Sequence, residues 1–218
     1  MTGWVELGLG FAVFALAHGV PARPPVRRRL TALLGERAYL VLYGTISLVL
    51  LGWLIAAAGR APYVAIWEPA PWQRRAVLPA MAAACLLVAL AIGAPNPFSF
   101  GGRGGAAFDP AHPGIVGPIR HPLLWALALW AGAHLLANGD LAHIVLFGGF
   151  LVMALAGIVV LDRRGRAQLG PAWPWLAVRR APGWRRRDLW RLLAAFLLFA
   201  GLLLAHPLVI GTDPLAGL

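Results

Sequence analysis

The sequence has few charged residues and no lysine. Only 12% of its 218 residues are charged, and all 19 basic residues are arginines, whereas about a quarter of the residues are charged in an ordinary soluble domain. Hydrophobic residues make up 60% of the chain, which leaves too few polar groups to cover the surface of a soluble protein. A lipid bilayer removes that requirement, because lipid solvates apolar side chains and the backbone pairs with itself as helix. The composition therefore excludes a soluble globular domain and indicates a membrane protein.

Reactive residues are scarce as well. The one cysteine, Cys85, lies in an apolar run, so the sequence has no disulfide framework, no CxxC pair and no CxxCH attachment site for covalent haem. It also lacks the HExxH zinc motif, a suggestively spaced Ser/His/Asp set and a pair of carboxylates suited to hydrolysis. Residues 1–17 contain Glu6 and no basic residue, which predicts a retained first helix rather than a signal peptide. The histidines remain as the main candidates for chemistry.

Apolar stretches without charge predict six transmembrane helices. One span needs about 20 apolar residues in helical conformation. The turn residues Asn138-Gly139-Asp140 predict a tight turn, and therefore an antiparallel hairpin of the fourth and fifth helices. The predicted helices lie near residues 3–20, 38–58, 76–94, 122–138, 141–161 and 191–210. We therefore predict an all-α fold, a polytopic transmembrane helix bundle of about six helices that forms a single domain over residues 1–218.

The distribution of arginine predicts the orientation of this bundle. Sixteen arginines follow the first, third and fifth predicted helices, three follow the second and none follows the fourth. Because short basic loops stay in the cytoplasm, this bias puts both termini on the outer side of a bacterial inner (plasma) membrane. We expect the basic loops to contact the anionic head groups of the lipid bilayer. Despite the formal charge of +11 we expect no nucleic-acid partner.

Among the histidines within predicted helices, His134 and His18 are the main candidates for chemistry. Ionisable groups inside a membrane are costly, so each one invites a functional hypothesis. His134 lies about 18 Å along its helix from Pro122, and its helical neighbours include Trp130 and Ala131, a face that admits a flat ring system. His18 has Phe14 one turn before it. At both positions the alternative is a neutral histidine that is hydrogen-bonded to a backbone carbonyl.

The remaining histidines have simpler interpretations. His121 and His206 each precede a proline, which favours a helix-end role. His112 lies in a predicted loop, and His143 lies near the outer end of the fifth helix. Two neutral imidazoles from different helices, without a thiolate or carboxylate nearby, suit the iron of haem b better than zinc. Haem b is therefore the cofactor that we expect.

Three strings of residues resemble a known family over nearly the whole chain. They are Gly35-Glu36-Arg37-Ala38-Tyr39, Arg120-His121-Pro122, and the run from Leu129 to Gly139 that contains Ala133-His134. In these strings the chain resembles the NnrU family of bacterial membrane proteins. The resemblance implies an association with nitrite and nitric oxide respiration as a sensor, an electron carrier or an accessory factor, with a partner in the respiratory chain.

The chain is also similar to the zeta-carotene isomerase of plants and algae (Z-ISO), a haem b enzyme. The shared residues are His18-Gly19, Gly35 to Ala38, His121 with His134, Asp162-Arg163-Arg164, and Ala205 to Leu208. This resemblance implies His18 and His134 as haem ligands, and a haem-dependent carotenoid cis–trans isomerase as the alternative function, with a carotenoid as partner. The chain has Ala131 where the isomerase has a cysteine, and Met153 or Ala154 where it has a histidine in the fifth helix.

The predicted topology bears on which histidines pair. It puts His18 near the cytoplasmic end of its helix and His134 nearer the outer face, so His206 and His143 are alternative partners for His134 in binding the haem iron. The residues that are candidates to support these ligands are Arg120, His121 and Trp130. Two further alternatives are a membrane methyltransferase, because Arg-His-Pro before a helix recurs in isoprenylcysteine-type enzymes, and a purely structural membrane subunit.

Overall fold

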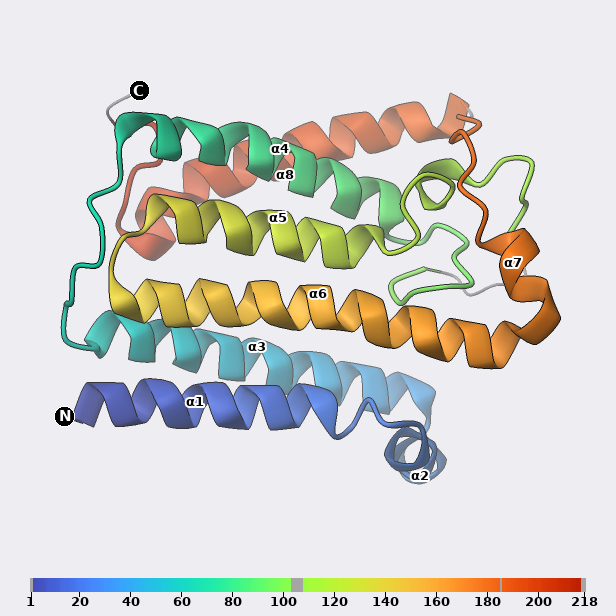
Figure 1. The fold of residues 1–218 in the computed structure, drawn as a ribbon, viewed down its shortest axis with the longest axis horizontal. Helices are drawn as coiled ribbons and strands as arrows, with labels where there is room; N and C mark the ends of the chain where they lie inside the picture. Colours follow the sequence, from blue (N-terminus) through green and yellow to red (C-terminus); the bar gives the residue numbers. More distant parts are fainter. Residues whose placement is uncertain (1, 103–107, 185, 217–218) are drawn as a thin grey trace. The chain divides into compact units, whose positions relative to one another are not determined.

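The structure is a computed structural model that describes residues 2–102, 108–184 and 186–216, and the described part is built from helices (Figure 1). The six long helices are α1 (Thr2–Gly19), α3 (Glu36–Arg60), α4 (Pro71–Ala91), α5 (Pro122–Ala137), α6 (Leu141–Leu169) and α8 (Leu189–Ile210). The short elements are α2 (Pro24–Leu34), α7 (Trp173–Leu176) and the 3-10 helices η1 (Gly114–Val116), η2 (Gly170–Ala172) and η3 (Arg186–Asp188). The all-α prediction is confirmed.

Several of these helices are suited to a lipid environment. Helices α3, α4 and α8, and α6 with its continuation to Leu176, are long and apolar enough to cross a membrane. Helices α1 and α2 meet at a bend of 77° and are together long and apolar enough for one broken span, whereas α5 is a shorter apolar helix. Only 6% of the apolar segment of α8 is buried, and the side chains of Phe196 and Leu204 are 64% and 75% exposed. Because exposed apolar surface of this extent is unfavourable in water, the fold is that of a helical membrane bundle.

Two helices extend beyond their predicted ends. Helix α4 begins at Pro71, which is a favourable first-turn residue, and includes Arg74. Helix α6 continues past the predicted end at residue 161 to Leu169 and includes Asp162. Long side chains can carry their charges out of the apolar zone, so a charged residue in a terminal turn does not end a helix. The charge-free stretches therefore underestimated both lengths.

Helix α2 was not predicted as a helix. Pro24 lies in its first turn, and Gly35, with φ of +77°, ends it. A non-glycine residue rarely adopts that backbone angle, so Gly35 separates α2 from α3. The arginines of α2 had been interpreted only as loop charges.

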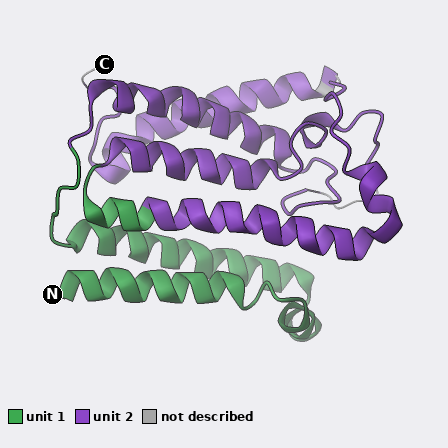
Figure 2. Ribbon diagram, in the orientation of Figure 1, with its two compact units in different colours: residues 1–67, 139–146 green, residues 68–138, 147–218 purple. Residues whose placement is uncertain are grey.

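The chain divides into two compact units, which are described separately (Figure 2). Unit 1 comprises residues 1–67 and 139–146, and it contains α1, α2, α3 and the first six residues of α6. Unit 2 comprises residues 68–138 and 147–218, and it contains α4, α5, most of α6, α7 and α8.

In unit 1, α1 and α3 pack as an antiparallel pair. Glu6 of α1 accepts hydrogen bonds from Nε1 of Trp53 at 3.0 Å and from Nε of Arg60 at 3.1 Å. Gly10 faces Leu54 of α3, so small residues on α1 allow close approach. At the other end of the pair, the hydroxyl of Tyr43 donates to the carbonyl of His18 at 3.5 Å.

In unit 2, α5 and α6 run antiparallel. Trp130 of α5 has its ring 5.3 Å from that of Phe147 at the beginning of α6 in this unit, and Leu124 lies against Gly157 further along α6. The predicted hairpin is therefore confirmed, and three residues, 138–140, join the two helices. Helix α4 packs against both α5 and α8. The core of this unit is formed by Ala84, Leu87, Leu90, Phe98, Ile115, Val116 and Ala126.

We expect Gly139→Ala to destabilise the protein by about 2 kcal/mol or more, as overpacking does. The carbonyl of Gly139 accepts hydrogen bonds from the backbone of Ile66 and Trp67, and a Cβ at Gly139 would lie 1.7 Å from the carbonyl oxygen of Trp67. Thermal unfolding in detergent measures the loss. Gly44→Ala is the matched control, because a Cβ there meets nothing within 4 Å, and equal melting temperatures for the two variants would contradict this interpretation.

Candidate functional site

His134 lies in the last turn of α5 and is surrounded by aromatic rings. Its Nδ1 donates to the carbonyl of Trp130, one turn earlier, at 2.8 Å. The imidazole ring lies 5.0 Å from the ring of Phe147 and 5.6 Å from that of Trp130. Trp130 therefore contacts His134 through both its carbonyl and its ring, and Nε2 carries the lone pair of this imidazole.

His18 lies in the last turn of α1 and has the same local arrangement. Its Nδ1 donates to the carbonyl of Phe14 at 3.0 Å, and the two rings stack with centroids 4.0 Å apart. The ring of Tyr43 from α3 lies edge-on at 5.6 Å. The lone pair of His18 is again on Nε2.

The two alternative ligand histidines bind different partners. His206 lies just before the last turn of α8, and its Nδ1 donates to the carbonyl of Thr212, beyond the end of that helix, at 2.6 Å. In unit 1, Nδ1 of His143 lies 2.6 Å from the carboxylate of Asp140. Neither histidine repeats the arrangement of His18 and His134, in which the bond lies within the same helix.

The structure brings Arg120 and His121 together with Asp162. The carboxylate of Asp162 accepts hydrogen bonds from Nη2 of Arg120 at 2.9 Å and from Nε of Arg120 at 3.3 Å. Nε2 of His121 donates to the same carboxylate at 2.8 Å. We call these three residues the Asp162 cluster. Because an ionised carboxylate only accepts, the proton of neutral His121 lies on Nε2 and the lone pair lies on Nδ1.

The Asp162 cluster is held from several sides. His121 is 1% exposed, and the side chains of Asp162 and Arg120 are 15% and 26% exposed. The carbonyl of Arg120 accepts a hydrogen bond from the side chain of Asn96. The guanidinium of Arg120 lies over the ring of Trp173, 5.9 Å from the ring centroid. Such a buried network is stable only if its charges are paired, and here the carboxylate of Asp162 pairs with the guanidinium of Arg120 and accepts a hydrogen bond from neutral His121.

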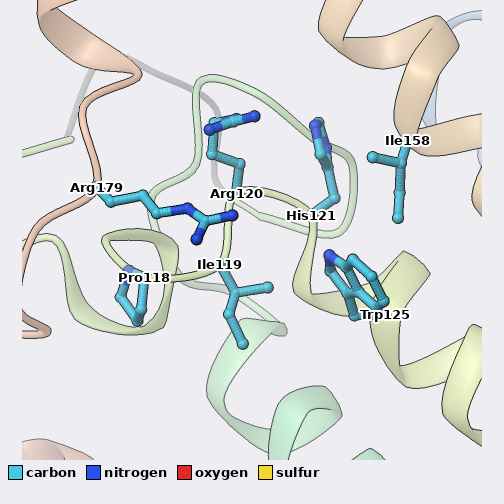
Figure 3. Close-up of a pocket in the computed structure, with 7 residues that line it drawn as sticks. All are labelled: Pro118, Ile119, Arg120, His121, Trp125, Ile158 and Arg179. Atoms are coloured by element: carbon cyan, nitrogen blue, oxygen red, sulfur yellow. The ribbon is translucent and has the colours of Figure 1, made fainter.

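A pocket of about 320 Å³ opens beside this cluster (Figure 3). The side chains of Arg120 and Arg179 lie on one side of it, and those of His121, Trp125 and Ile158 lie on the other (Figure 3). We call it the His121 pocket, and its lining residues are Pro118, Ile119, Arg120, His121, Trp125, Ile158 and Arg179.

The Asp162 cluster and His134 lie at opposite ends of α5. Thirteen residues separate His121 from His134, which is about 20 Å along a helix. Arg120 and His121 therefore do not contact His134, although both were predicted to support the ligand histidines. They support a different site.

Asp162 is the site residue that sequence reasoning missed. In the sequence it stands out only as part of the Asp-Arg-Arg string that follows the fifth predicted helix. It is separated from Arg120 by 42 residues, so no local pattern predicts their contact. The available signal was that α6 contains a single acidic residue among arginines.

Among residues 2–102, 108–184 and 186–216, no group of three or more His, Cys, Asp or Glu side chains could hold a metal ion. A haem iron needs only two axial protein ligands, because the porphyrin supplies the others. Taken separately, His18 in unit 1 and His134 in unit 2 each have the chemistry of such a ligand, since each ring has its Nδ1–H bonded to a carbonyl and its lone pair on Nε2.

Apolar helices, histidines near helix ends and a buried charged cluster define a polytopic helical membrane protein. The family model described as "NnrU protein" matches residues 6–214, so the chain belongs to the NnrU family. Neither a curated protein nor a solved structure matches the chain.

Proposed function

We propose that this NnrU-family protein binds haem b in the bacterial inner membrane, with His18 and His134 as axial ligands. In this role it supports nitrite and nitric oxide respiration as a sensor, an electron carrier or an accessory factor. The observation that carries the proposal is the arrangement shared by the two histidines. Each lies in the last turn of an apolar helix and donates its Nδ1–H to the carbonyl four residues earlier.

This arrangement prepares an imidazole to bind a metal. A hydrogen bond from Nδ1 fixes the tautomer and the ring orientation, and it makes Nε2 more basic. A histidine without such a bond rotates about its side-chain bonds and exchanges tautomers. The hydrogen bond to the carbonyl of Phe14 or Trp130 fixes both in advance, so less entropy is lost when the imidazole binds a metal. A bound haem b would supply one-electron redox chemistry and a site for small gaseous ligands.

Aromatic neighbours support the same proposal. His18 packs against Phe14 and Tyr43, and within unit 2 His134 packs against Trp130 and Phe147. Flat apolar rings of this kind exclude water and favour contact with a macrocycle. Among the described residues His206 has no such ring contact, which favours His18 and His134 over His206 as the ligands.

Carotenoid isomerase chemistry has less support. The position that holds a cysteine in Z-ISO is Ala131 here, and Ala131 is 0% exposed. A buried methyl group supplies neither a ligand nor a proton.

We expect the purified protein, supplied with haem during expression, to show a Soret band and a sharp α band in the reduced-minus-oxidised difference spectrum. Two neutral imidazoles produce a low-spin haem, and the pyridine haemochrome measures the amount bound per chain. Absence of the Soret band after haem supply would falsify the proposal. An unrelated six-helix membrane protein, expressed and purified in the same way, controls for adsorbed haem.

A further inference from the structure

His121 differs from the other five histidines in which ring nitrogen is engaged. In the others Nδ1 lies within hydrogen-bond distance of an oxygen: the carbonyls of Phe14, Trp130 and Thr212, and the carboxylates of Asp109 and Asp140. His121 instead uses Nε2, which donates to Asp162. Its Nδ1 is buried, and no residue in the described part of the chain pairs with it.

A buried ring nitrogen without a hydrogen-bond partner destabilises the folded protein. Leaving a buried polar atom without a partner costs about 1–3 kcal/mol. His121 is 1% exposed, so bulk water does not compensate that cost. The imidazole nevertheless lines the His121 pocket, where a bound molecule could pair with Nδ1.

The pocket also carries an excess of positive charge. The guanidinium of Arg120 is neutralised by Asp162. Arg179, which lies on the same side of the pocket as Arg120 and across from His121, extends its guanidinium towards the pocket and is exposed (Figure 3). It has no hydrogen-bond or ion-pair partner among the described residues. A guanidinium can donate two parallel hydrogen bonds to the oxygens of one phosphate or carboxylate group. The part of the pocket beside Arg179 therefore favours binding of an oxyanion.

The position of the pocket along the helices indicates the source of that oxyanion. The apolar part of α5 begins at Pro122, and the apolar part of α6 ends at Leu161. Arg179 and His121 lie outside these apolar stretches, whereas Trp125 lies one turn inside and is 44% exposed. The pocket therefore joins a basic wall to an apolar wall at the depth where phospholipid head groups lie.

We propose that the His121 pocket binds the phosphate group of an anionic phospholipid. One phosphate oxygen contacts the guanidinium of Arg179, and another accepts a hydrogen bond from Nδ1 of His121. For that bond His121 takes up a second proton from the surrounding water, and the resulting imidazolium lies between two anions, the carboxylate of Asp162 and the phosphate. The glycerol and the beginning of the acyl chains lie along Trp125 and Ile158. Asp162 is a positioning residue here, because it acts through His121.

The first test measures binding of dioleoyl phosphatidylglycerol to the full chain in detergent by native mass spectrometry. A charge-assisted hydrogen bond contributes enough that Arg179→Gln should weaken binding about tenfold or more. Arg179→Lys, which keeps the charge, should retain part of the affinity. Arg29→Gln is the matched control, because Arg29 is an exposed arginine of α2 far along the chain from the pocket. Phosphatidylcholine with the same acyl chains should bind more weakly, because its choline cation meets Arg179.

Three results would overturn this proposal. Arg29→Gln could weaken binding as much as Arg179→Gln, which would indicate only nonspecific attraction to basic surface. Arg179→Gln could leave the affinity unchanged. Glycerol 3-phosphate could bind in an Arg179-dependent way while the lipid does not, which would identify a soluble phosphate compound as the occupant instead.

A second test observes His121 without changing it. In protein labelled with ¹⁵N-histidine, one Nδ1 resonance should fall in the range of a nitrogen that carries a lone pair, because the other five histidines have Nδ1 engaged. Phosphatidylglycerol should move that resonance into the range of an N–H. An unchanged resonance at saturating lipid contradicts the contact with His121. This test does not depend on haem, so its failure leaves the proposed function unaffected.

Discussion

His134→Ala is expected to remove nearly all haem from the purified protein. Changing a residue that only supports a metal ligand already costs about 10- to 100-fold in affinity, so loss of a ligand should cost at least as much. His134 lies against Phe147 and Trp130 in unit 2, and alanine leaves these rings in place. The pyridine haemochrome measures the haem content per chain. A decrease of at least about tenfold is the expected result.

The controls for this prediction come from the other histidines. His112→Ala should leave the haem content unchanged, because His112 is exposed and contacts Asp109. His18→Ala should lower the haem content or convert the remaining haem from low spin to high spin, which the position of the Soret band reports. The assignment of His134 fails if its alanine variant keeps a normal spectrum while His206→Ala loses it.

Asp162→Asn is expected to lower the free energy of unfolding by about 2 kcal/mol. Removing one partner of a buried ion pair leaves an uncompensated charge and costs about 3–5 kcal/mol, and the partial exposure of Arg120 reduces that value. The carboxylate of Asp162 is the acceptor for both Arg120 and His121. An amide of the same shape can accept from one of them but lacks the charge. Thermal unfolding in detergent, followed by circular dichroism, measures the effect.

Two further variants separate the ion pair from a general effect of the substitution. Asp213→Asn changes an exposed aspartate that accepts a hydrogen bond from the backbone of Leu215, and it should shift the melting temperature little. The double variant Arg120→Gln/Asp162→Asn should lose less stability than the sum of its single changes, because the second change no longer breaks an intact pair. A purely additive result would show that the contact between Arg120 and Asp162 contributes nothing.

Most of the helical framework could be predicted from the sequence. The six apolar stretches all form helices, because within a membrane the backbone must satisfy its own hydrogen bonds. The ends were less predictable, as α4 and α6 show, since an arginine in a terminal turn can extend its charge towards the head groups. Helix α2 was missed because three arginines suggested a loop, whereas the structure combines them with apolar residues in one short helix.

At the candidate sites, too, contacts within one helix could be predicted from the sequence, whereas contacts between distant residues could not. The hydrogen bonds of His18 and His134 follow from helix geometry alone, because each acceptor lies four residues earlier on the same helix. The contact of Trp130 with His134 has the same local origin. The sequence also contained Arg120 and His121 next to each other, but it did not reveal their partner.

By itself, then, the sequence determined the apolar helices, the hairpin of α5 and α6, and the hydrogen bonds of His18 and His134 to carbonyls of their own helices. These properties depend on residues within one or two turns of each other. The tertiary structure alone decided that Asp162 meets Arg120 and His121, that Nδ1 of His121 remains unpaired beside Arg179, and that Glu6 pairs with Trp53 and Arg60. Such contacts join residues about 40 or more positions apart. They exist only after helices have packed, because packing brings together side chains that no periodicity in the sequence relates.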